Sequence, residues 1–292
     1  MKSIWKTTTC ERCKRDKFPL GRRKDKKMYN LIKSHNFTLR HDMLTVITVI
    51  SLFVLPYIGM WFNGILEGVS FGDLTSSRFL LYMGAALPEI FVFAIMILVA
   101  KAVGGDSSDK TINYEMASGH SRSQVYWSRI ITGLLWGVVI VFVACFVPYG
   151  VLTLINGWGD NISLEEIAVR FAIMIFPMIR FAGLFMLITS LVGNAGGGMA
   201  FSYVIVFIET IFDAVFEELA AFDRTYVFAL SNLAKILNYN NSWEFVENGK
   251  VITWFDYSTP NELIVKTIVV SMVLATVYVT VGYLVFKKKD KN

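Results

Sequence analysis

Two cysteines near the start of the chain have the spacing of a metal-ligand pair. Cys10 and Cys13 form the run Cys-Glu-Arg-Cys, in which two thiolates can bind one Zn²⁺. His35 and His41 follow in the same basic stretch, but their spacing is not that of a zinc finger. We therefore expect two reduced thiols in a cytosolic tail, with zinc shared between two copies of the chain as the alternative.

Three ionisable residues interrupt long apolar runs and are candidates for transport chemistry. Glu89, Arg180 and Glu209 are the charged residues placed deepest in such runs. Inside a membrane, residues of this kind face the bundle interior, a cavity or one another, because a charge in hydrocarbon is costly. They can line a substrate path or relay charge, or they can form an ion pair that fixes helix contacts. Both interpretations stay open.

Sequence motifs for enzyme chemistry are imperfect or missing. The run GGDSSDKT at 104–111 approximates a phosphate-binding loop, but Asp109 stands where the motif needs glycine, and its carboxylate would repel phosphate. The zinc-protease pattern His-Glu-x-x-His does not occur in the sequence. We expect no catalytic or nucleotide-binding site in this chain.

The composition indicates the setting in which these residues work. Of 292 residues, 54% are hydrophobic and only 17% are charged, and the mean hydropathy is +0.52. Soluble proteins carry more charge and less apolar area. The sequence therefore predicts an all-α integral membrane protein.

Six runs are apolar and long enough to cross a bilayer as helices. We expect spans at about 43–66, 79–100, 130–156, 171–192, 199–219 and 263–286. Lys and Arg number 13 in residues 1–41, four in 101–129 and four after 286, so six spans place all of these on one side. The positive-inside rule then puts both termini in the cytoplasm.

The segments between and beside the spans complete the predicted organisation. Residues 1–41 form a basic cytoplasmic tail that carries an amphipathic interfacial helix over 28–40, and its charge suits anionic lipids better than nucleic acid. The transmembrane domain covers 42–286, and 287–292 form a second cytoplasmic tail. The outer segment 220–262 combines a helix with a hairpin around Asn248-Gly249.

The cytoplasmic loop 104–129 contains a short amphipathic helix pattern. Ile112, Glu115, Met116 and Gly119 follow the helical spacing i, i+3, i+4 and i+7. Apolar side chains among charges suit a groove on a soluble subunit.

This loop, read as DKTINYEMASGHSRSQVYWSR, resembles the loop between spans two and three in membrane subunits of ABC-2 type transporters. Ser121-Arg122 match the Ser-Arg step of that family's pattern, and Arg129 stands where a basic residue closes the loop. The resemblance implies a coupling helix that contacts a separate ATPase. The contact residues it implies are Ile112, Tyr114, Glu115, Met116, Gly119 and Arg122.

The same resemblance implies the partners. Two ATPase subunits, which bind ATP and Mg²⁺, would pair with this chain and a second permease copy or a paralogue. The complex would export an amphipathic or hydrophobic substrate, such as an antimicrobial peptide, a drug-like molecule or a lipid-linked compound, across a bacterial plasma membrane. The path would be lined partly by spans one, two and five.

Two other functions fit the sequence. An ion- or proton-coupled secondary transporter would use Glu89, Arg180 and Glu209 as its transport site. A membrane sensor or immunity protein without transport activity would use the outer segment 220–262 to bind its ligand.

Overall fold

The structure is a computed structural model, and it describes residues 20–66, 68, 75–79, 87–108, 111–159, 162–219, 228–239, 241–247, 250–256 and 258–288. Cys10 and Cys13 lie outside the described residues, so the zinc hypothesis for them stays a prediction.

Six helices of the described residues are long and apolar enough to cross a membrane, as predicted. The six are α2 (Met43–Leu66), α4 (Leu87–Ser108), the continuous helix α6–η4–α7 (Arg122–Leu134, Leu135–Ile140, Val141–Asn156), α8 (Leu164–Val192), α9 (Ala195–Leu219) and α11 (Asn261–Lys288). The other helices of the described residues are α1 (Leu20–His41), η3 (Ser76–Arg78), α5 (Thr111–Ala117) and α10 (Ala229–Leu237).

The second span, predicted over 79–100, contains the helix α4. The structure describes α4 from Leu87 to Ser108, and residues 80–86 of the predicted range lie outside the described residues. Pro88 is compatible with the first described turn, because proline lacks an N–H and its fixed φ suits the start of a helix. The helices α4 and α6 therefore extend into the predicted loop 104–129 from both sides, and α5 lies between them.

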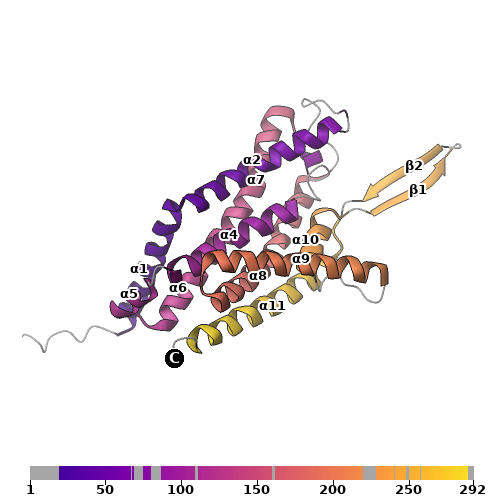
Figure 1. The fold of residues 1–292 in the computed structure, drawn as a ribbon. Helices are drawn as coiled ribbons and strands as arrows, with labels where there is room; N and C mark the ends of the chain where they lie inside the picture. The colour runs from indigo at the N-terminus through magenta and orange to yellow at the C-terminus, as the bar shows by residue number, and fades with distance from the viewer. Residues whose placement is uncertain are drawn as a thin grey trace, which may run out of the picture.

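The two ends of the bundle carry different segments. Figure 1 shows α1, α5 and the C-terminal end of α11 at one end, and the strands β1 (Asn241–Glu247) and β2 (Lys250–Asp256) at the other. The strands pair antiparallel, with Glu247 opposite Lys250, as the predicted hairpin requires. The prediction of an all-α protein therefore applies to the spans and not to the hairpin.

The helix α8 forms the centre of the bundle. Phe171, Met174, Met178, Phe181 and Phe185 are all fully buried, and they recur every three or four residues, which places them on one face of the helix. Helices α4, α9 and α11 pack around α8.

A glycine lies at the contact between α8 and α11. A Cβ on Gly183 would lie 3.3 Å from the carbonyl oxygen of Ala275 on α11. Small residues at this point let the two backbones approach, which is the usual way in which helices associate in a membrane.

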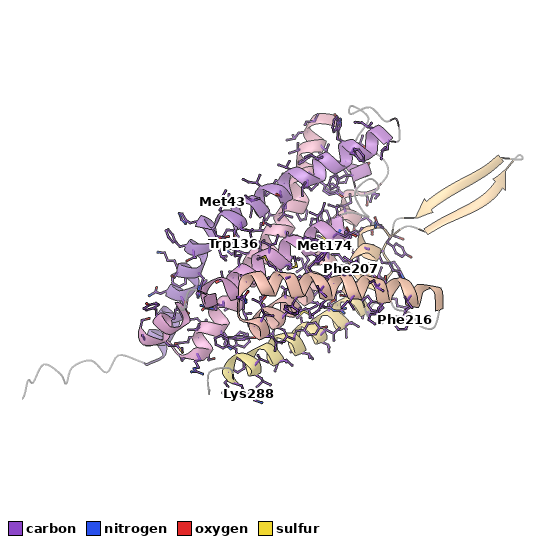
Figure 2. All side chains as sticks on the ribbon, viewed as in Figure 1. Met43, Trp136, Met174, Phe207, Phe216 and Lys288 are labelled. Atoms are coloured by element: carbon purple, nitrogen blue, oxygen red, sulfur yellow. The ribbon has the colours of Figure 1, made fainter. Side chains whose placement is uncertain are left out.

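Helix α9 lies on the outside of the bundle. Figure 2 shows its side chains along the ribbon, with Phe207 and Phe216 labelled, whereas Met174 lies within the bundle. Phe207 is 56% exposed. An apolar face of this kind is suited to lipid or to another membrane protein.

The segment η4 in the third span is a π-helix of six residues. A Cβ on Gly137 within it would lie 3.1 Å from Val99 Cγ2 on α4. A Cβ on Gly133, one turn earlier, would lie 3.1 Å from Met186 Cε on α8 and 3.5 Å from Ala102 Cβ on α4. Wider helical turns of this type are rare and often occur at functional sites.

Candidate functional site

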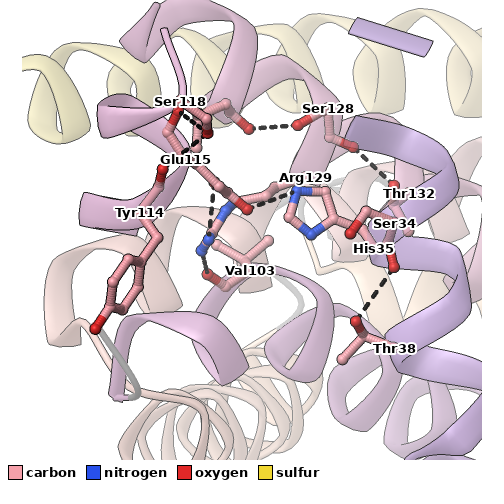
Figure 3. Close-up of polar contacts among 11 residues, drawn as sticks. Ser34, His35, Thr38, Val103, Tyr114, Glu115, Ser118, Ser128, Arg129 and Thr132 are labelled. Carbon is pink, nitrogen blue, oxygen red and sulfur yellow. Dashed lines mark hydrogen bonds and ion pairs between the residues drawn. The ribbon is translucent and has the colours of Figure 1, made fainter. Parts of the chain in front are cut away.

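The short helix α5 is tied to the bundle by a single carboxylate. Glu115 Oε2 lies 3.4 Å from Arg129 Nη2 on α6, and Glu115 Oε1 lies 3.4 Å from His35 Nε2 on α1. Figure 3 shows the three side chains converging between α1, α5 and α6. One acid thus joins α5 to two other helices.

Arg129 extends this connection to a fourth helix. Its Nη1 donates a hydrogen bond of 3.0 Å to the carbonyl oxygen of Val103 near the end of α4. Only 2% of the Arg129 side chain is exposed. A buried guanidinium needs such acceptors, because removing it from water without a partner would cost several kcal/mol.

The outward side of α5 presents an aromatic side chain. Tyr114 is 73% exposed, and it points away from the Glu115 contacts in Figure 3. Met116 is half-buried, and Ile112 lies in the first turn of α5, although its side chain is outside the described ones. The exposed surface of α5 therefore centres on Tyr114.

The end of α5 and the start of α6 form a sharp, well-defined turn. Gly119 has φ +83°, a conformation that favours glycine. Ser121 caps α6, since its side chain accepts from the Gln124 N–H while the Gln124 side chain accepts from the Ser121 N–H. Arg122 is the first residue of α6 and is half-buried.

The structure corrects one expectation in this region. Glu115 faces the bundle, with only 16% of its side chain exposed, and so it does not lie on the α5 surface that a partner would contact. His35 and Arg129 complete the site, and their partnership with Glu115 was not predicted. Their signal is two basic side chains next to spans, together with the single acid of the α5 sequence TINYEMA.

A second group of ionisable residues surrounds a cavity of about 180 Å³ at the far end of the bundle. Its lining comes from α4, α9 and α10, and consists of Pro88, Glu89, Glu209, Thr210, Asp213, Phe228, Leu230, Ser231 and Ala234. The structure therefore brings together two of the three predicted intramembrane residues. Glu89 lies in the first described turn of α4 and is exposed.

The remaining predicted residue lies next to the cavity. Arg180 is 6% exposed and interacts electrostatically with Glu209. The Glu209 carboxylate also accepts a hydrogen bond from the Ala229 N–H, and Asp213 accepts one from the Ser231 hydroxyl. These two acids on α9 hold the start of α10, which lacks a side-chain cap of its own. Asp213 was not predicted, although it follows Glu209 by four residues and thus shares its helix face.

Among the described residues, no group of three His, Cys, Asp or Glu side chains has an arrangement that could hold a metal ion. No protein-family model matches the chain, and no curated protein matches it significantly. The class that the fold defines is a multi-pass membrane protein with six long apolar helices.

Proposed function

We propose that this chain is the membrane permease subunit of an ABC exporter, and that α5 couples it to a separate ATPase. The observation that carries the proposal is the Glu115 carboxylate, which ties an exposed end helix to α1 and α6. A helix that only connected two spans would not need such an anchor.

The contacts suggest how movement would pass from the ATPase to the membrane. A partner groove that receives Tyr114 would move α5 when the partner closes around nucleotide. Glu115 would transmit this movement to Arg129, and the Arg129 hydrogen bond to Val103 would carry it to α4. Charge-assisted hydrogen bonds in a buried setting are stiff enough for this role.

The proposed complex holds two ATPase subunits, which bind ATP and Mg²⁺, and a second permease copy or a paralogue. The end with α5 and the chain termini would face the bacterial cytoplasm, and α1 would lie along the membrane surface. The substrate would be an amphipathic or hydrophobic peptide, drug-like molecule or lipid-linked compound, moved outward. The exposed apolar faces of α2 and α9 support a substrate path along these helices or a contact with the second permease there.

A detergent pull-down from native membranes tests the proposal. The tagged wild-type chain should retain a soluble ATPase in stoichiometric amount, and Tyr114→Asp and Met116→Asp should lose it. Tyr29→Asp is a matched control, because Tyr29 is a similarly exposed tyrosine, 67% accessible, on α1. Loss of the ATPase in Tyr29→Asp as well, or its absence from the wild type, would contradict the proposal.

A secondary transporter is the second candidate, and the shared cavity of Glu89 and Glu209 favours it. Carboxylates in a cavity between helices are the usual site of coupling ions. In proteoliposomes without any ATPase, an imposed ion gradient should then drive uptake that Glu209→Gln abolishes. Glu165→Gln, an exposed acid at the start of α8, is the control. Gradient-driven transport that is insensitive to Tyr114→Asp would replace the permease proposal.

A further inference from the structure

A groove of about 240 Å³ runs between α1 and the third span, at the end of the bundle that carries α5. On the α1 side it is lined by Ile32, Asn36 and Arg40, which follow one another at intervals of four residues and so form one stripe. The opposite wall includes Leu135 and Ile140, the first and last residues of the π-helix η4.

The two walls are joined by a polar contact in which the indole N–H of Trp136 donates a hydrogen bond of 2.9 Å to Asn36 Oδ1. This contact fixes the orientation of α1 against η4. The π-helix widens the turn at the point where the groove lies, and such segments often mark ligand sites.

The groove is lined by both charged and apolar side chains. Arg40 lies in the last turn of α1, directly before the apolar helix α2 begins at Met43, so it marks the boundary between water and hydrocarbon. Tryptophans such as Trp136 are typical of the same boundary. Leu135 and Ile140 give the groove an apolar wall on the side of the third span. A ligand that fits must therefore carry both a charged group and an apolar part.

The charges around the groove favour a negative headgroup. Arg40 lines the groove and is exposed, and His41 is the next residue. The acid closest to Arg40 in the sequence is Asp42, but its Oδ1 lies 2.7 Å from Lys101 Nζ, so a cation already balances it. A guanidinium binds phosphate through two parallel hydrogen bonds, which makes arginine well suited to phospholipid headgroups.

We propose that this groove is a binding site for an anionic phospholipid. The phosphate contacts Arg40, the glycerol region lies beside Asn36 and Trp136, and the first part of one acyl chain follows Leu135 and Ile140. The remainder of the lipid stays in the bilayer. The inference depends only on the membrane location of the chain and not on the transported substrate.

Native mass spectrometry of the purified full-length chain tests this site. The protein is titrated with phosphatidylglycerol and, in parallel, with phosphatidylcholine of the same acyl composition. The wild type should bind the first phosphatidylglycerol more tightly, and Arg40→Gln should weaken that step by at least about tenfold, because it removes the charge and the two hydrogen bonds of the guanidinium. Lys33→Gln removes the same charge from an exposed position on α1 outside the groove and should leave the step unchanged.

A second variant tests the apolar half of the groove. Leu135→Trp fills the space between the helices and should reduce tight binding of both lipids. Equal weakening by Arg40→Gln and Lys33→Gln would show a diffuse attraction of anionic lipid to a basic surface and would overturn the proposal. Equal affinity of the wild type for the two lipids would also overturn it.

Discussion

Arg129 on α6 and Glu115 on α5 form an ion pair of 3.4 Å, which ties these neighbouring helices to each other. The pair has unequal exposure, since 2% of the Arg129 side chain and 16% of the Glu115 side chain reach solvent. The arginine therefore depends on the glutamate more than the reverse, because only the glutamate can be solvated in place.

Neutralising this acid should loosen α5. Glu115→Gln keeps the shape of the side chain but leaves Arg129 with a weaker acceptor, and we expect the free energy of unfolding to fall by about 1–3 kcal/mol. Thermal unfolding in detergent measures the change. Glu165→Gln should have an effect within about 0.5 kcal/mol, since Glu165 is exposed. Equal effects of the two changes would show that the ion pair contributes nothing specific.

A second buried arginine should control the stability of α10. Arg170 is 1% exposed, and its guanidinium donates to the carbonyl oxygens of Leu237 at 3.0 Å and Tyr239 at 2.7 Å. Arg170→Met would leave these buried acceptors without their donor. We expect amide hydrogen exchange in 229–237 to increase by at least about tenfold, the equivalent of ~1.4 kcal/mol. Unchanged exchange in α10 would show that other contacts hold this helix.

Two adjacent glycines in α4 should respond to alanine in opposite directions. A Cβ on Gly104 would lie 2.7 Å from the Ala195 backbone nitrogen and 2.8 Å from the Asn194 carbonyl carbon, whereas a Cβ on Gly105 meets no atom within 4 Å. Gly104→Ala forces two backbones apart and should destabilise the protein by about 1–3 kcal/mol. Gly105→Ala should be neutral or stabilise it by up to about 1 kcal/mol, because alanine is the better helix former. Thermal unfolding of both variants distinguishes a close contact from a general intolerance of alanine in α4.

The contact of Asp42 with Lys101, at the junction of α1 and α2, should stabilise the protein less in acid. Burial raises the pKa of the Asp42 carboxyl, but the hydrogen bonds from the Lys101 ammonium and from Thr45 outweigh this and hold the pKa below its ordinary value of 3.8. The unfolded chain then binds a proton more readily than the folded one, so the contribution is complete well above pH 3.8 and is lost as the pH falls through the lower folded pKa.

The variant Asp42→Asn tests how much the Asp42 carboxylate contributes to stability. The wild type should unfold at a higher temperature than the variant at pH 7, and the difference should shrink only below about pH 4. A difference that is already lost near pH 6 would assign the acid sensitivity to another group.

The spans were predictable because each consists of a long apolar run, and a helix is the only way for such a run to satisfy its backbone in lipid. The predicted start of the second span stays a prediction, since residues 80–86 lie outside the described residues. The glycine run at 193–198 holds the turn between α8 and α9 only at its start. Gly193 ends α8 with φ +85°, and the Gly197 N–H donates to the side chain of Asn194 at the start of α9.

The helix α5 shows where prediction from the sequence stops. Tyr114, Glu115 and Met116 were assigned together to a partner contact, yet consecutive residues on a helix point about 100° apart, so the three side chains cannot all point the same way. The polar partners His35 and Arg129 hold Glu115 toward the bundle. This orientation depends on residues 80 positions and 14 positions away in the chain, which no local pattern encodes.

The six π-helical residues Leu135–Ile140 also affect how the third span can vary in length. Elsewhere in a helix, removing one residue rotates everything beyond it by about 100° and turns buried faces outward. A π-helical turn already contains one residue more than an α-helical turn. A deletion within 135–140 can therefore be absorbed by tightening the turn, and α7 keeps its orientation against η3 and α8. The span can thus lose a residue at 135–140 without rearranging the outer half of the bundle. The groove beside α1 would change shape instead, because Leu135 and Ile140 line it.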